Sequence, residues 1–252
     1  MTKEYAQSKF DETTNDPYYS KFAKTTPKII GVWDDHDYGN NNGDMTFEKK
    51  HIFREMYLDF IREPQDSERR LEKDSGIYQD YLLTSSDGVK VHFILMDVRF
   101  DFNETQPQDR LGPKQFAWLD RVLSQHSEAD VTLIGGGVQI LPDRWFFTEA
   151  FGWDKSKRSL LEVIAKHKKS GVILLSGDVH FAQFYSTRCK SLTGYEIPEL
   201  TSSGLTHHVN SFFKIADRAL NMVTPRFWNT SEILMDFNFG LLQIQRVAAD
   251  DV

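Results

Sequence analysis

The sequence contains a single cysteine, Cys189, so no disulfide can form within the chain and no cysteine-based zinc site can be built. It has no apolar run of the roughly 20 residues needed to span a bilayer. Residues 1–16 lack the apolar stretch of a signal peptide, which leaves the compartment open. Basic residues do not dominate, and the formal net charge of −7 disfavours non-specific nucleic-acid binding.

What the chain does contain is enough apolar material for a core. Of 252 residues, 40% are hydrophobic and 13% are aromatic, so disorder over most of the length is not expected. No repeat or strong linker divides the chain. We therefore expect one domain over residues 1–252, with a polar segment at 1–26, the core motifs at 27–210, and a C-terminal helix and strands at 211–252.

Hydrophobic patterns predict a mixed order of strands and helices. Strands are expected at 28–33, 77–83, 89–98, 131–134 and 172–175, with further strands in the tail at 233–247. Asp87-Gly88 predicts a hairpin turn between the second and third strands. Helices are expected at 45–61, from Pro113 onward, and at 156–169. This mixture predicts a layered α/β fold.

The first candidate site is the run Trp33-Asp34-Asp35-His36-Asp37, which follows an apolar stretch. Three carboxylates and an imidazole within four positions require compensating positive charge if they are buried. A hard cation held by carboxylate oxygens would supply it. The alternative is a solvated acidic turn, since aspartate is common in turns for local reasons.

A second candidate site is Gly177-Asp178-Val179-His180, which also follows an apolar stretch. In an extended backbone Asp178 and His180 project to the same side, so a carboxylate and an imidazole would point at one spot. The alternative is a polar turn with a satisfied histidine. Two such clusters, each after a predicted strand, favour a shared ligand site at the carboxyl ends of the strands.

Several strings in this order and spacing resemble the PhoD-like metallophosphatases, the alkaline phosphatase D branch of the calcineurin-like phosphoesterase superfamily. They are GVWDDHDYGNNNG (31–43), LMDVRF (95–100), LGPKQFAWL (111–119), GGGVQILP (135–142), LLSGDVHFAQF (174–184) and ELTSSGLTH (199–207). The resemblance implies a β-sandwich flanked by helices. It also implies a binuclear site of divalent or trivalent ions (Fe, Ca, Mn or Zn), in which a metal-activated water hydrolyses a small-molecule or lipid phosphate ester.

The same resemblance implies roles for individual residues. It places Asp35, Asn41, Asp178 and His180 as metal ligands and His36 as the group that assists the leaving oxygen. Asp34 and Asp37 are expected to orient ligands. Apart from the resemblance, His207 follows a Ser/Gly-rich loop, and it is expected either to line the pocket or to be an ordinary surface or core histidine. Arg99 is expected either to clamp phosphate or to form a structural ion pair.

The family pattern also includes an earlier Gly-Asp-x-x-Tyr module, and no Gly-Asp pair precedes Trp33. We therefore expect a fold that is incomplete at its N-terminus. Two functions remain open, a phosphoric ester hydrolase and a truncated or degenerate domain with an interaction or regulatory role. An enzyme that acts on carbohydrate or lipid through paired carboxylates is disfavoured, because the acidic residues cluster with histidine.

Overall fold

The computed structural model describes residues 2–103, 105, 110–142, 151, 154–167, 169–187, 190–209, 228–230 and 233–246. Cys189 lies outside these residues. The described strands form one seven-stranded sheet in the order β1-β2-β3-β4-β6-β5-β7. Their bounds are β1 Gln79–Thr84, β2 Lys90–Leu95, β3 Val131–Gly135, β4 Val172–Ser176, β5 Ala182–Thr187, β6 Pro198–Ser202 and β7 Trp228–Thr230.

The four central strands, β2, β3, β4 and β6, are parallel to one another, whereas β1, β5 and β7 pair antiparallel with their neighbours. The carboxyl ends of the parallel strands therefore lie along one edge of the sheet. Ligand sites in open α/β sheets are commonly formed at this edge, by the segments that follow the strands.

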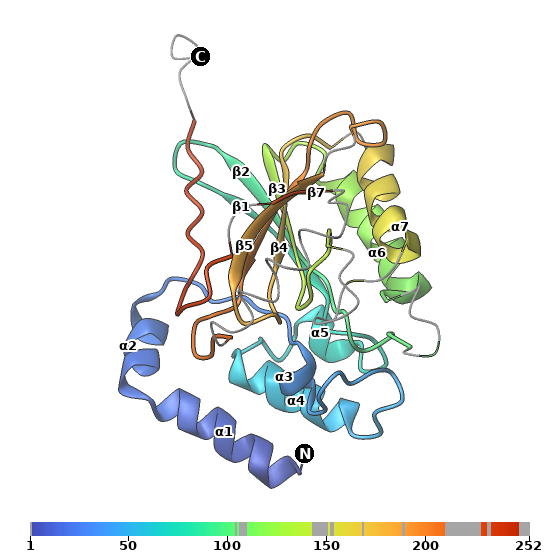
Figure 1. Cartoon of the computed structure of the whole chain (residues 1–252). Coiled ribbons are helices and arrows are strands. Elements are labelled where there is room, and N and C mark those ends of the chain that lie inside the picture. The colour runs from blue at the N-terminus through green and yellow to red at the C-terminus, as the bar shows by residue number, and fades with distance from the viewer. Residues whose placement is uncertain are drawn as a thin grey trace.

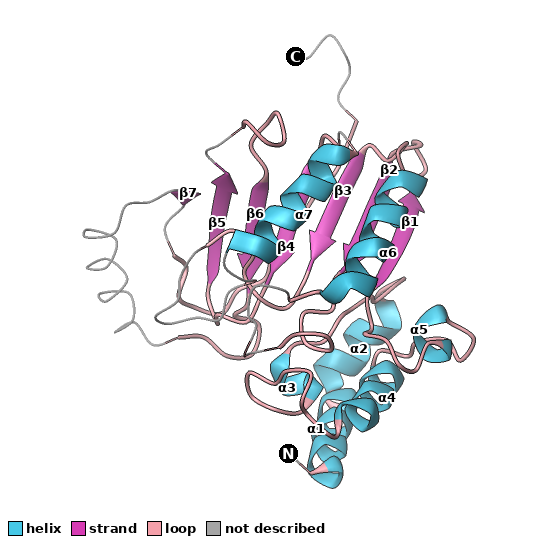
Figure 2. Cartoon of the chain, turned by 90° about the vertical axis from the view of Figure 1, so that its right-hand side faces the viewer, coloured by secondary structure: helices cyan, strands magenta, loops and turns pink. Residues whose placement is uncertain are grey.

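Helices α6 (Gly112–Gln125) and α7 (Asp154–Lys166) lie side by side on one face of the sheet (Figure 2). Pro113 opens α6, where its missing N–H costs no helical hydrogen bond. Leu119 and Val122 of α6 and Leu160 and Ile164 of α7 are buried in one apolar cluster with Ile94, Ile134 and Leu174 of the sheet. Burial of this cluster is the main apolar contribution to stability, at roughly 1.5–3 kcal/mol for each fully buried side chain.

The remaining helices gather beyond one end of the sheet (Figure 1). They are α1 Lys3–Asn15, α2 Pro17–Thr25, α3 Asp35–Tyr38, α4 Lys50–Phe60 and α5 Glu68–Leu71. A second apolar cluster joins α3 and α4 to the segments beside them, with Trp33, Tyr38, Tyr57, Leu58, Ile77 and Phe100 as its buried members and Phe10 of α1 packed against it. None of the described helices has the length and apolar character required to cross a membrane.

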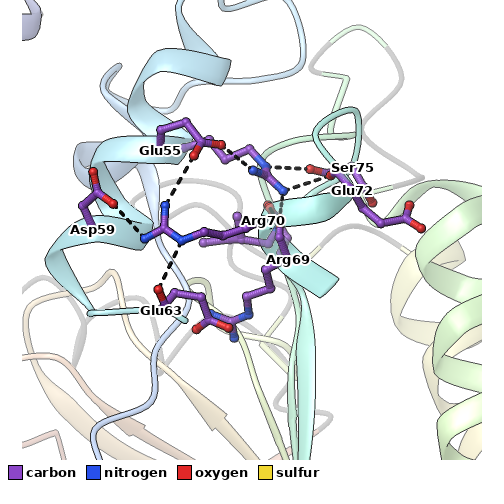
Figure 3. A network of polar contacts seen from close by, with 10 residues as sticks. Glu55, Asp59, Glu63, Arg69, Arg70, Glu72 and Ser75 are labelled. Atoms are coloured by element: carbon purple, nitrogen blue, oxygen red, sulfur yellow. Dashed lines mark hydrogen bonds and ion pairs between the residues drawn. The ribbon is translucent and has the colours of Figure 1, made fainter. Parts of the chain in front are cut away.

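A network of arginines fastens α4, α5 and the segment between them (Figure 3). The Arg54 side chain, 1% exposed, donates to the carbonyls of Arg69, Glu72 and Ser75 and to the Glu55 carboxylate. Arg70 forms an ion pair with Asp59 at 2.7 Å. Arg69 donates to the Gly31 carbonyl at 2.9 Å, which ties this unit to the chain entering the Asp34–Asp37 segment.

Much of the predicted element order is confirmed. The predicted strands at 77–83, 89–98, 131–134 and 172–175 correspond to β1–β4, and Gly88, with φ +82°, lies in the turn of the β1–β2 hairpin. The predicted helices from Pro113 and at 156–169 correspond to α6 and α7. The mixed α/β class is confirmed as a mixed sheet with flanking helices. Because all described strands belong to one sheet, the second sheet of a sandwich is not found among the described residues.

The predicted strand at 28–33 is wrong. This segment pairs with no described strand, and its apolar side chains pack against helices instead, with Trp33 at 5.0 Å from Tyr38 between ring centroids. An apolar run indicates that the segment is buried. It does not distinguish burial against helices from burial in a sheet. The strands expected at 233–247 are also wrong, since the described residues 233–246 form only an isolated bridge, Ala182–Leu234.

The helix expected at 45–61 begins later than predicted, at Lys50. Asp44, just before the expected start, does not cap the helix, and its carboxylate accepts from the Thr46 N–H and hydroxyl at 2.9 and 2.6 Å. Because the carboxylate is bonded within this local turn, the helix begins further along the chain.

Replacing Arg54 with alanine should destabilise the fold by about 3–5 kcal/mol, because three carbonyls, two of them in buried contacts, and the Glu55 carboxylate lose their donor. Arg158→Ala is the matched control, since Arg158 is exposed and pairs with Glu162 four residues on. We expect that control to change stability by about 0.5 kcal/mol or less. Urea unfolding of both variants measures the difference, and equal losses would contradict the role given to Arg54.

Candidate metal centre

The candidate site lies at the edge where the parallel strands end. The segment 96–100 follows β2, Gly136 and Gly137 follow β3, 177–181 follows β4, and 203–207 follows β6. Helix α3, beyond this edge of the sheet in Figure 1, begins at Asp35. The two motifs around Asp34–Asp37 and Gly177–His180 are far apart in sequence, and the strand order brings them together.

Three carboxylates from these two motifs converge. Asp34, Asp35 and Asp178 each offer an oxygen, and these three oxygens lie within 4.8 Å of one another. Asp35 is buried, at 6% exposure, and the other two are half-buried. Carboxylates this close repel one another in a partly desolvated setting unless a positive charge lies among or beside them.

Arg99 supplies one such charge. Its Nε and Nη2 both lie 2.6 Å from Asp34 Oδ1. Arg99 is completely buried, so its guanidinium is directed at Asp34 and not at solvent. Of the two expectations for Arg99, the geometry fits an ion pair that fixes Asp34.

The backbone around Arg99 is fixed by a buried aspartate that sequence reasoning passed over. Asp97 is inaccessible to solvent, and its carboxylate accepts from the backbone N–H groups of Ile77, Arg99 and Phe100 at 2.8–3.0 Å. This carboxylate is fully used inside the fold. The sequence signal was a polar residue directly after an apolar strand. This signal does not distinguish a metal ligand from a residue that only holds the backbone in place.

A glycine allows the Asp34 side chain to reach its position. A Cβ at Gly137 would lie 2.4 Å from Asp34 Cγ, closer than any non-bonded contact permits. The Gly137 carbonyl also accepts from the Gly177 N–H at 2.8 Å, which joins the segments after β3 and β4. The string Gly135-Gly136-Gly137 at the end of a predicted strand was the sequence signal for this close approach.

Asp35 is positioned by the short helix α3 and the loop after it. Its Oδ1 accepts from the His36 N–H at 2.7 Å, and its Oδ2 accepts from the Asn42 N–H at 3.0 Å. Gly39, with φ +102°, closes α3 in the left-handed conformation that favours glycine. Asn41, expected as a metal ligand, is exposed in this loop.

Asp178 and His180 do not have the extended backbone expected from the sequence. Both have positive φ, +71° and +58°, which is uncommon for residues other than glycine. The chain turns sharply after β4, so the two side chains do not simply share one side. Asp178 joins the carboxylates, whereas His180 lies outside that 4.8 Å group.

His180 nevertheless faces the same region. Its ring centroid lies 6.2 Å from that of His207. Burial lowers the pKa of His180 below its usual 6.5, and repulsion from His207 and His36 lowers it further, against a smaller opposing effect of Asp35. The two motifs thus converge on one region through both carboxylates and imidazoles.

The remaining predicted residues lie on the rim or beneath it. The His36 side chain is 70% exposed and lies 4.0 Å from Asp35 Oδ2. Asp37 accepts from the Asp34 N–H at 3.3 Å, and burial raises its pKa. Asp37 therefore braces the backbone of Asp34 and does not enter the group of three carboxylates described above.

The three carboxylates and one guanidinium carry a net negative charge, so the donor set fits a cation. All three ligands are carboxylate oxygens, which suit hard ions such as Mg²⁺, Ca²⁺ or Mn²⁺. The described residues bring together ligands for one such ion.

No protein family and no curated protein matches the chain. Among solved structures it is similar to one of PhoD, with a TM-score of 0.49 and 18% identity over 68% of this chain and 39% of the other. It is also similar to GAP50, the anchor in the inner membrane complex of Plasmodium, with a TM-score of 0.34 and 17% identity over 50% of this chain and 36% of the other. The chain thus spans well under half the length of either protein, and at these scores neither likeness bears on activity.

Adding a methyl group at Gly137 should displace Asp34. We expect Gly137→Ala to destabilise the fold by about 1–3 kcal/mol, because the new Cβ overlaps the Asp34 carboxylate. Gly135→Ala is the control two residues earlier, where the nearest atom is Leu95 Cδ2 at an ordinary 3.6 Å. Thermal unfolding of both variants measures the effect. Equal stability of G137A and G135A would contradict the account, because it would mean that Asp34 moves away from the new Cβ without loss of stability.

The pKa of His180 should rise when a neighbouring imidazole is removed. In the chelator-treated protein, NMR titration should place it below 6.5, and His207→Gln should move it upward. His51→Gln is the control, since His51 packs against Phe100.

Because the folded pKa lies below the unfolded value, the His180 contribution to stability is present above about pH 6.5 and is lost as the pH falls through the folded pKa. A parent value at or above 6.5 would contradict the packing described for His180.

Proposed function

We propose that the chain is a metal-dependent phosphoric ester hydrolase. The observation that carries this proposal is the convergence of Asp34, Asp35 and Asp178 at the carboxyl edge of the sheet, beside a group of imidazoles. The three carboxylates outnumber the single guanidinium beside them, so negative charge remains that a cation can neutralise. Strongly interacting titratable groups of this kind are characteristic of functional sites.

In this proposal the three carboxylates hold one cation and Arg99 fixes the orientation of Asp34. A bound cation supplies the charge that neutralises a phosphate ester and lowers the pKa of a coordinated water. Asp35 is held by backbone N–H groups on both oxygens, so its carboxylate is pre-oriented before an ion arrives.

The histidines have different tasks in this proposal. His36 is exposed beside Asp35, where it can donate a proton to the leaving oxygen of a substrate entering from solvent. The lowered pKa keeps His180 neutral at pH 7, with a lone pair free to bind a second ion or accept a proton. A second ion would lie toward His180 and His207.

The substrate class we propose is a small-molecule or lipid phosphate ester. The acidic chain, with a formal net charge of −7, is poorly suited to bind a nucleic-acid backbone. The positive field for one ester group would come from metal ions at the strand edge.

A second candidate function is a non-catalytic metal-binding domain with an interaction or regulatory role. One observation favours it, namely that His180 lies outside the group of three carboxylates at this edge, where the described residues form a single group of three ligand atoms. In that case the protein would bind a cation at the same residues without hydrolysing esters.

Hydrolysis of p-nitrophenyl phosphate by the full chain tests the proposal. After removal of metals, activity should return with Mn²⁺, Mg²⁺ or Ca²⁺, and Asp178→Asn should lower kcat/KM by about 100-fold or more, since a lost ligand weakens the charge at the phosphate. Asp11→Asn is the control, because Asp11 is an exposed carboxylate on α1 that bonds to Gln7.

The outcomes separate the two functions. Metal binding that needs Asp178, with no hydrolysis of any phosphate ester tried, would support the non-catalytic domain. Hydrolysis at an unchanged rate in D178N would overturn the proposed site. Unchanged metal binding in D178N would overturn it as well.

A further inference from the structure

A second cluster of metal-ligating side chains lies apart from the candidate metal centre. Asp80 of β1, His92 of β2 and His126 at the end of α6 each offer one ligand atom, and these atoms lie within 4.8 Å of one another. Register explains how they meet. Asp80 pairs with Ile94, so its side chain shares with His92 the face that α6 covers.

Both imidazoles direct the same nitrogen at the same oxygen. His92 Nε2 lies 2.9 Å and His126 Nε2 lies 3.4 Å from Asp80 Oδ2. The two rings meet edge to face with centroids 4.7 Å apart. An ion pair with Asp80 needs only one imidazole. Here a second imidazole approaches the same Asp80 oxygen.

Among the described residues, neither outer nitrogen makes the hydrogen bond that is typical of metal-ligating histidines. Such a histidine binds through one ring nitrogen and donates the other N–H to an acceptor, often a carboxylate. His126 Nδ1 lies 3.8 Å from Glu128 Oε1. His92 Nδ1 is buried without a hydrogen-bond partner, and so is the hydroxyl of Thr132, which pairs with His92 in register on the adjacent strand.

Burial of an unpartnered nitrogen in His92 is also informative, because buried polar atoms normally have a hydrogen-bond partner. His92 is completely buried, so an imidazole placed there only for packing leaves a polar atom unsatisfied, which destabilises the fold. A cation at Nε2 would fix the proton of the His92 ring on Nδ1.

We propose that Asp80, His92 and His126 form a binding site for a borderline divalent cation of the Zn²⁺ class. Two imidazoles and one carboxylate are a typical three-ligand set for tetrahedral zinc, with water in the fourth position. Water can reach it, because the Asp80 and His126 side chains are 16% and 28% exposed. The ion would clamp the end of α6 to the β1–β2 hairpin, and none of its ligands belongs to the carboxylate centre.

Cobalt substitution tests this site in the full chain. Chelator-treated D178N protein, which lacks a ligand of the carboxylate centre, should bind one Co²⁺ with the intense visible absorption of a tetrahedral ion. Adding His126→Gln or Asp80→Asn should abolish that absorption and weaken Zn²⁺ binding by about 100-fold or more. His92 is left intact because it is fully buried.

His167→Gln is the matched control. His167 lies 2.7 Å from Asp120, but no second imidazole is described beside that pair. In the D178N background the control should keep the cobalt spectrum, and Zn²⁺ should raise the melting temperature of D178N and D178N/H167Q but not of D178N/H126Q. An absence of tetrahedral cobalt absorption in D178N would overturn the proposal, as would a spectrum that survives both H126Q and D80N. Either result leaves the hydrolase proposal standing, since that rests on other residues.

Discussion

The candidate metal centre depends on one contact, the fork from Arg99 to a single oxygen of Asp34. Arg99 follows β2 and Asp34 precedes α3, so this contact joins the sheet to the helical unit beyond its edge. A fully buried guanidinium is costly to desolvate unless it is paired. Asp34 is therefore held in place, and the position of the first motif relative to Asp178 follows from it.

The surrounding structure serves this contact in several ways. Asp97 holds the backbone of Arg99, and Gly137 leaves the space that the Asp34 carboxylate occupies. Arg69 binds the Gly31 carbonyl and so steadies the chain that leads into Asp34. The core under α6 and α7 aligns the strand ends, whereas these polar contacts set the side-chain geometry at the edge.

The sequence predicted the strands and helices whose hydrophobic periodicity is strong, such as β2, β3, α6 and α7. The strand prediction at 28–33 is wrong, because an apolar run indicates burial but does not indicate which element the segment packs against. Convergence of the two acidic motifs was anticipated, but the left-handed backbone at Asp178 and His180 was not, since positive φ in non-glycine residues has no reliable sequence signal. The cluster of Asp80, His92 and His126 was missed because it depends on hairpin register and on where α6 ends.

The most direct test of the central claim is anomalous diffraction from crystals soaked in Mn²⁺. An ion shared by the three carboxylates predicts an anomalous peak about 2.0–2.6 Å from oxygens of Asp34, Asp35 and Asp178. The account is contradicted if these carboxylates show no peak while Arg99 remains paired with Asp34, because the guanidinium alone would then balance their charge.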